Sequence, residues 1–143
     1  MSTADQNKNS ILKFRDAINS CDENLANELI DSKAEFASLV SPEKLYGGSG
    51  YLSVVKFMRK SFSDIHWEIE DLVGDEDKVA VSWTCSGTHD GEFMGNPATG
   101  KKFEFSCMNF YYFNREGKIV NDAAAQGLIG LLQSLGMIQQ PNM

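Results

Sequence analysis

This 143-residue chain contains little that would form a disulfide, hold a metal or bind nucleic acid. Its three cysteines are widely spaced and odd in number, so they predict no disulfide framework. Its two histidines, His66 and His89, have no second histidine or nearby cysteine, and we predict no metal site and no cofactor. The net charge of −7 disfavours nucleic acid and anionic membranes as partners, because phosphate groups bind basic surfaces.

Long apolar segments are also missing. No run approaches the roughly 18 apolar residues of a membrane span, and the polar N-terminal segment lacks the apolar centre of a signal peptide. The glycine cluster 47–50 has no Lys-Ser/Thr continuation, which excludes a phosphate-binding loop. We therefore expect a cytoplasmic protein with reduced cysteines. Its length fits one domain, placed at 5–137, with flexible tails at 1–4 and 138–143.

Helical periodicity is present at the start of the chain. Apolar residues recur at helical spacing before position 20, and Asp22 is the predicted N-cap of a second helix. We expect irregular structure over 31–49, with the glycine cluster as a loop. A third helix is predicted from about Tyr51. The apolar stripes of the first and third helices are Ile11, Phe14, Ala17 and Ile18, and Tyr51, Val54, Val55, Met58 and Phe62.

The pattern changes to period two from Ile65, which predicts β-strands. After a first strand, two long strands at 79–89 and 102–113 are joined by a loop at 90–101. A last strand at 119–126 precedes a short helix that Gly136 ends. Helices followed by hairpin-connected strands predict an α+β fold, with a curved antiparallel sheet and helices packed on one face.

The two long strands present a continuous apolar face that we interpret as the floor of a ligand cavity. Its polar exceptions are Asn109, which needs a partner if it is buried, and His89. That histidine could act as a general acid or base, or hydrogen bond a backbone carbonyl beside the loop. On the opposite face, Met108, Phe110 and Tyr112 are apolar. A second subunit would cover them, so we expect a homodimer.

Several segments in order along the chain resemble the SnoaL-like polyketide cyclase family. The resemblance covers about residues 5–137. The matching segments are Phe-Ser-Asp-Ile-His-Trp-Glu-Ile-Glu-Asp-Leu at 62–72, Trp83, Gly-Thr-His-Asp-Gly-Glu-Phe-Met-Gly at 87–95, Pro97, Thr-Gly-Lys-Lys-Phe-Glu-Phe at 99–105, Gly-Lys-Ile-Val at 117–120 and Gly-Leu-Leu-Gln-Ser-Leu-Gly at 130–136.

This resemblance implies the nuclear-transport-factor-2-like fold, a cone-shaped α+β barrel with a deep apolar pocket that is commonly dimeric. Members of the family include enzymes that close polyketide rings by an intramolecular aldol step. That reaction needs an acid/base pair that enolises the substrate and protonates the new alkoxide. Other proteins with the fold are isomerases, dehydratases, hydrolases and binders without catalysis, and the fold alone does not choose among them.

The chain departs from the family pattern after Gly-Lys-Ile-Val. The usual tryptophan position is Ala123, and the usual acidic positions are Ala124 and Gly127. Asp122 is the carboxylate that remains there, and His89 is kept. The early His-Asp-Pro element has no counterpart in 36–39. If the tryptophan-to-alanine exchange lies inside the cavity, the pocket should be larger than in relatives, or filled by Phe and Met side chains from elsewhere.

Three hypotheses follow from these observations. In the first, the protein binds a small apolar, polyketide-like or aromatic molecule with reduced catalysis. In the second, it is an active cyclase, isomerase or hydratase with His89 and Asp122 as the acid/base pair. In the third, it is a dimerisation module whose cavity is filled. The candidate ligand-binding residues are Tyr51, Trp83, Phe105, Asn109 and Gln126.

Overall fold

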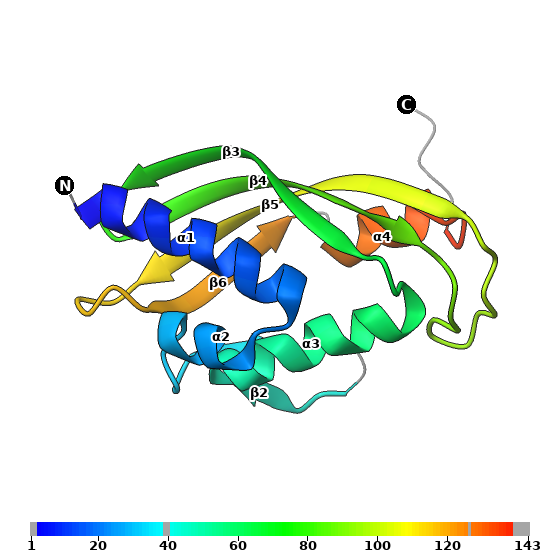
Figure 1. Ribbon diagram of the computed structural model, residues 1–143, viewed down its shortest axis with the longest axis horizontal. Helices are drawn as coiled ribbons and strands as arrows, with labels where there is room; N and C mark the ends of the chain where they lie inside the picture. Colours follow the sequence, from blue (N-terminus) through cyan, green and yellow to red (C-terminus); the bar gives the residue numbers. More distant parts are fainter. Residues whose placement is uncertain (1–2, 39–40, 126, 139–143) are drawn as a thin grey trace.

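The computed structural model describes residues 3–38, 41–125 and 127–138. Its N-terminal half is mainly helical and its C-terminal half mainly strand (Figure 1). The predicted C-terminal tail lies outside the described residues except for Ile138, and the first helix already begins at Thr3. The elements are α1 (Thr3–Ser20), α2 (Glu23–Leu29), β1 (Glu35–Ala37), β2 (Lys44–Tyr46), α3 (Gly47–Ser61), β3 (His66–Asp75), β4 (Lys78–Thr88), β5 (Lys102–Phe113), β6 (Ile119–Ala125) and α4 (Gly127–Ser134).

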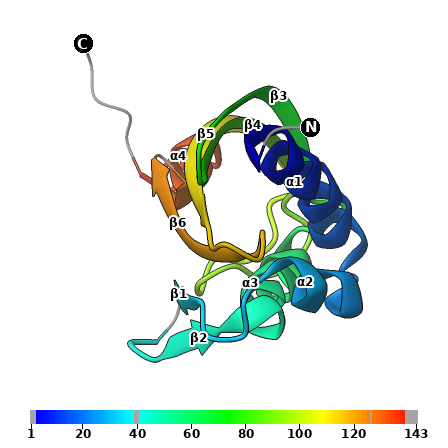
Figure 2. The ribbon, with the colours of Figure 1, turned by 90° about the vertical axis from the view of Figure 1, so that its left-hand side faces the viewer.

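The main sheet is antiparallel, with the strand order β3-β4-β5-β6. Its strands are strongly curved, and α1, α2 and α3 lie on the concave side, so that the elements form a ring when viewed end-on (Figure 2). A register shift between Ile69 and Asp71 interrupts the β3–β4 pairing, and such bulges bend a strand. The predicted α+β fold with a curved antiparallel sheet is confirmed.

The two faces of the long hairpin differ as its sequence predicts. Along β4 the residues from Val79 to Cys85 alternate between buried and half-buried. On the concave face, Trp83 and Tyr111 are each 2% exposed, and they join the core cluster that α1 and α3 complete. On the convex face, Met108 is 62% and Phe110 51% exposed. The alternation therefore assigns both faces correctly.

The first two helices follow their predicted signals. The stripe of α1 is buried against the sheet, and the Asp22 side chain accepts a hydrogen bond of 3.0 Å from the Leu25 backbone N–H at the start of α2. Near the end of α1, the amide of Asn19 bonds both the N–H and the carbonyl of Trp67, each at 2.9 Å. This pair of bonds fixes α1 on β3. None of the helices in the described ranges is long and apolar enough to cross a membrane.

The predicted loop at the glycine cluster is wrong, because these residues form the first turn of α3. Gly48 lies against α2 so closely that an added Cβ would be 2.4 Å from the Ala26 carbonyl carbon. Asn27 of α2 also accepts a hydrogen bond of 3.0 Å from the Ser49 backbone N–H. Glycine is required here because it lets two helix backbones meet, a tertiary demand that a local turn rule does not contain.

The segment expected to be irregular contains a small hairpin. β1 and β2 pair antiparallel over three residues each, with Phe36 opposite Leu45. This hairpin lies beside α3 and below β6 in Figure 2. It brings Phe36, which is 7% exposed, into the core. Strands this short carry no measurable alternation, so their pairing was not visible in the sequence.

Candidate functional site

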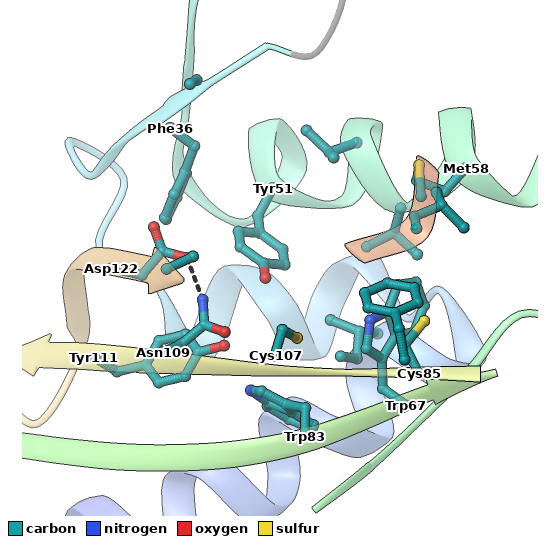
Figure 3. A pocket seen from close by; sticks show the side chains of 17 residues that line it. Phe36, Tyr51, Met58, Trp67, Trp83, Cys85, Cys107, Asn109, Tyr111 and Asp122 are labelled. Atoms are coloured by element: carbon teal, nitrogen blue, oxygen red, sulfur yellow. Dashed lines mark hydrogen bonds between the residues drawn. The ribbon is translucent and has the colours of Figure 1, made fainter. Parts of the chain in front are cut away.

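A cavity of about 310 Å³ lies between the concave face of the sheet and α3. Its walls come from α1, β1, α3, all four strands of the main sheet and α4, and Figure 3 shows the side chains converging on it. Ala37 and Ala124 line the cavity and are also exposed. They therefore mark its mouth, between β1 and β6.

Most of the lining is apolar and aromatic. Trp83 and Phe105, predicted as ligand contacts, both line the cavity, together with Trp67 from β3 and Phe36 from β1. Trp67 and Trp83 are the only two tryptophans of the chain. A flat apolar molecule would therefore contact aromatic faces on several sides.

One end of the cavity is polar. Asn109 and Tyr111 on β5 face it, and they pair with Ala124 and Asp122 on β6. This register places Asn109 diagonally opposite Asp122, and the Asn109 Nδ2 donates a hydrogen bond of 3.4 Å to the Asp122 Oδ2, the dashed line of Figure 3. Tyr51 reaches the same region from α3. The partner that a buried Asn109 was expected to need is therefore Asp122.

Two tyrosines and a tryptophan lie around Phe14 beside this carboxylate. Tyr51, Trp83 and Tyr111 all line the cavity. The Phe14 ring contacts all three edge-on, with centroids 5.0 Å from Tyr51, 5.4 Å from Tyr111 and 6.4 Å from Trp83. Phe14 is 1% exposed, so it holds the three rings in a packed core.

Burial raises the pKa of every titratable side chain that lines the cavity. Burial raises the pKa of Asp122, against a smaller lowering by the hydrogen bond from Asn109. Burial also raises the pKa of both Tyr51 and Tyr111, so their hydroxyls keep their protons. The thiols of Cys85 and Cys107 line the cavity, and burial likewise raises their pKa. The cavity therefore offers hydroxyl donors and a carboxyl group suited to exchanging a proton.

His89 lies outside this group. It is fully buried, its Nδ1 is 2.9 Å from the Thr99 Oγ1, and its ring packs on Phe62 at 5.5 Å. Its Nε2 has no hydrogen-bond partner among the described residues. Its backbone N–H donates to the Lys101 carbonyl at 2.8 Å. These contacts place it at the base of the 90–101 loop, where its ring bonds the Thr99 hydroxyl and not a backbone carbonyl as one interpretation expected.

The structure does not bring His89 and Asp122 together. Asp122 pairs with Tyr111, which pairs with Val79 at the start of β4. His89 follows the other end of that strand, ten residues later, which is roughly 30 Å of extended chain. Because His89 is also absent from the cavity lining, the predicted acid/base pair of these two residues has no geometric basis.

The remaining predicted residues divide clearly. Tyr51, Trp83, Phe105 and Asn109 all line the cavity, whereas Gln126 lies outside the described residues. Ala123, the usual tryptophan position, pairs with Phe110 on the convex face. Ala123 does not line the cavity, so the condition under which we expected a larger pocket is not met.

The ligand contacts named from the sequence omit Tyr111 and Phe36, which both line the cavity. Tyr111 shares the inward face of its strand with Asn109, so alternation could have identified it. No local signal marks Phe36. Within the described ranges, no group of three or more His, Cys, Asp or Glu residues could hold a metal ion.

Comparison with known proteins identifies the relatives of this chain. The family model described as SnoaL-like polyketide cyclase matches residues 9–135. No curated protein matches the chain. The structure of IdmH, a candidate polyketide cyclase from Streptomyces antibioticus, has 30% sequence identity and a TM-score of 0.76, with 92% of this chain and 99% of that chain covered.

Two further structures extend the likeness. A candidate polyketide cyclase from Bacillus cereus has 25% identity and a TM-score of 0.74, with 94% of this chain and 83% of that chain covered. A candidate SnoaL-like polyketide cyclase from Jannaschia has 15% identity and a TM-score of 0.80, with 97% of each chain covered. At that identity, the last likeness concerns the fold alone.

Proposed function

This chain belongs to the SnoaL-like polyketide cyclase family, and from that premise we propose that it binds a small, flat, largely apolar molecule with one polar group. The observation that supports this proposal is the cavity of about 310 Å³, which is aromatic along its walls and polar at one end. Its volume lies at the lower end of the range of small-molecule sites. An open cavity also argues against the hypothesis of a dimerisation module with a filled interior.

The apolar lining accounts for affinity and the polar end for orientation. Transfer of apolar surface out of water contributes about 25 cal/mol per Å², so most of the binding free energy would come from ring contacts with Trp67, Trp83 and Phe105. A ligand that placed a polar atom against them would leave it without a hydrogen bond. The same atom at the Tyr51 and Asp122 end would have partners.

Intrinsic fluorescence tests this proposal directly, because both tryptophans of the chain line the cavity. Titration with 2-acetylnaphthalene is expected to change the emission in a saturable way. The matched variants are Ala124→Phe, which would fill the mouth, and Ala123→Phe, which places the same ring on the opposite face of β6. Binding should be lost in the first and kept in the second. Equal binding by both variants would show that the ligand does not enter this cavity.

A second candidate function is acid–base catalysis by Asp122, as in the ring closure after which the family is named. Its supporting observation is a half-buried carboxyl group whose pKa burial raises, within an apolar cavity. The Asp122 carboxylate would remove an α-proton from a ketone, and the Tyr51 hydroxyl would donate a hydrogen bond to the enolate oxygen. The enolate carbon would then attack a second carbonyl of the same molecule, and the Asp122 carboxyl would return its proton to the alkoxide.

Proton exchange separates the catalyst from the binder. In D₂O, the methyl protons of 2-acetylnaphthalene should exchange faster with the protein than without it, as measured by proton NMR. Asp122→Asn should lower that rate by about 10²–10⁴-fold, the usual contribution of a general base, while ligand binding persists. His89→Gln should leave the rate unchanged, because His89 lies outside the cavity. Exchange that persists in Asp122→Asn, or that depends on His89, would exclude Asp122 as the base.

A further inference from the structure

The side-chain amide of Asn109 has a fixed orientation at the polar end of the cavity. Its Nδ2 donates a hydrogen bond to the Asp122 Oδ2 at 3.4 Å. An ionised carboxylate can only accept hydrogen bonds, so the amide meets it with the nitrogen and not with the oxygen. The Asn109 Oδ1 therefore points in another direction, and the contact with Asp122 determines which direction that is.

This oxygen faces the interior of the cavity. Asn109 is 9% exposed and lines the cavity from β5. In Figure 3 its amide nitrogen points along the dashed line to Asp122, and its oxygen lies on the side of Tyr51 and Cys107. The described residues contain fully buried side-chain atoms without a partner, but the Asn109 Oδ1 is not one of them. A molecule in the cavity can therefore reach it.

The neighbouring strands offer this oxygen no side-chain donor. Asn109 stands opposite Val81 on β4 and Ala124 on β6, and both of these side chains are aliphatic. A carbonyl oxygen that has left water without gaining a donor is unfavourable. The hydrogen that satisfies the Asn109 Oδ1 must therefore come from whatever occupies the cavity.

We propose that Asn109 determines ligand specificity, because its Oδ1 accepts a hydrogen bond from the hydroxyl group of a phenol or enol bound in the cavity. This inference rests on the proposed function of the cavity as a small-molecule site. It narrows the polar group of the ligand to a neutral hydrogen-bond donor attached to a flat, conjugated ring.

The other groups of the cavity favour a hydroxyl over charged donors and acceptors. A ligand carboxylate has no hydrogen to donate, and an ionised Asp122 would repel it. A protonated amine would lose its hydration among apolar walls, a cost that one carboxylate repays only with excellent geometry. A phenol keeps its proton at neutral pH, since phenolic groups ionise near pH 10, and its ring suits the aromatic walls.

The test compares two probes that differ in one hydrogen-bond donor. In 2-naphthol the ring oxygen carries a hydrogen, and in 2-methoxynaphthalene a methyl group replaces that hydrogen. Isothermal titration calorimetry gives a dissociation constant for each, and we define the ratio as that of the ether over that of the phenol. The probes also differ in their hydration, but this difference cancels when the ratio of a variant is compared with that of wild type.

Asn109→Leu removes the acceptor and keeps a side chain of similar size. It should lower the ratio by about 2- to 12-fold, which is the range for one hydrogen bond between neutral groups. 2-Acetylnaphthalene, which has no hydroxyl hydrogen, should respond to this variant as the ether does. The matched control is Cys107→Ala, on the same inward face of β5. It should change both affinities in parallel and leave the ratio as in wild type.

A second pair of variants covers the case in which Asn109→Leu does not fold because Asp122 has lost its partner. Replacing both partners of a buried hydrogen bond by apolar groups can be nearly neutral for stability. The double variant Asn109→Leu with Asp122→Leu is therefore compared with Asp122→Leu alone. The double variant should have the lower ratio, by the same factor, because only the single variant retains the amide oxygen.

The outcomes separate this proposal from the proposed function. If the probes bind but Asn109→Leu leaves the ratio unchanged, the hydroxyl has another acceptor, and the role of Asn109 is overturned while the cavity function stands. An equal fall of the ratio in Cys107→Ala would attribute the effect to packing and would also overturn that role. If wild type binds neither these probes nor 2-acetylnaphthalene, the proposed function fails as well.

Discussion

Replacing Gly48 by alanine should destabilise the fold and disturb the cavity, although alanine is the better helix former. The added Cβ would lie 2.4 Å from the Ala26 carbonyl carbon and 2.5 Å from the Asn27 nitrogen, both backbone atoms of α2. Ordinary contact begins at 3.4 Å, so the helices must separate by about 1 Å. Overpacking of this kind costs about 1–3 kcal/mol, and rigid backbone contacts favour the upper value. The gain in helix propensity is about 1 kcal/mol, which leaves a net loss of about 2 kcal/mol.

Urea unfolding followed by far-ultraviolet circular dichroism measures this loss, and Gly50→Ala is the matched control. Gly50 lies in the same helix, but its added Cβ would be 3.0 Å from the nearest atom, so a shift of a few tenths of an ångström relieves it. Its propensity gain should offset most of that cost. Because α3 also contributes Tyr51, Val55 and Met58 to the cavity, Gly48→Ala should weaken binding of 2-acetylnaphthalene as well. If both variants have the same free energy of unfolding, the helix contact does not explain why Gly48 is a glycine.

Three further predictions address the carboxylate, the exposed face and a helix cap. Burial raises the pKa of Asp122 above its ordinary value of 3.8, so the free energy of unfolding of the wild type should fall as pH rises through the raised pKa. Urea unfolding should therefore show Asp122→Asn to be more stable than wild type at pH 7. The difference between the two should shrink toward pH 3.8. We propose that a homodimer buries the exposed convex face around Met108 and Phe110. Light scattering should then give twice the chain mass for wild type and the monomer mass for Phe110→Glu. A monomeric wild type would contradict this proposal. Asp22→Ala removes the cap of α2 and should cost about 1 kcal/mol in the same unfolding assay, whereas no loss would mean that the cap is not needed.

Local pattern was sufficient wherever a physical rule acts within a few residues. The alternation of β4 and β5 predicted which side chains are buried, because successive residues of a strand point to opposite faces. Asp22 was identifiable as a cap because a carboxylate accepts from backbone N–H groups two or three residues ahead. Gly136, which has a positive φ, follows the end of α4 as predicted. The family resemblance rests on the same segments and is confirmed over residues 9–135.

The candidate site depends on pairings between distant segments, and here the sequence was a poor guide. His89 and Asp122 are both chemically suited to proton transfer, yet strand register places them at opposite ends of β4. The face of Asp122 could not be known until β6 was aligned with β5, since a shift of one residue would turn it outward.

By itself, the sequence determined the α+β class, the inward face of the hairpin and the aromatic character of the cavity, because these follow from periodicity and composition. Tertiary structure alone decided that Asn109 meets Asp122, that Tyr51, Trp83 and Tyr111 gather around Phe14, and that His89 stays apart. The physical reason is that hydrogen bonding requires atoms within about 3 Å. That proximity arises from strand register and helix packing, which no local pattern in this chain encodes.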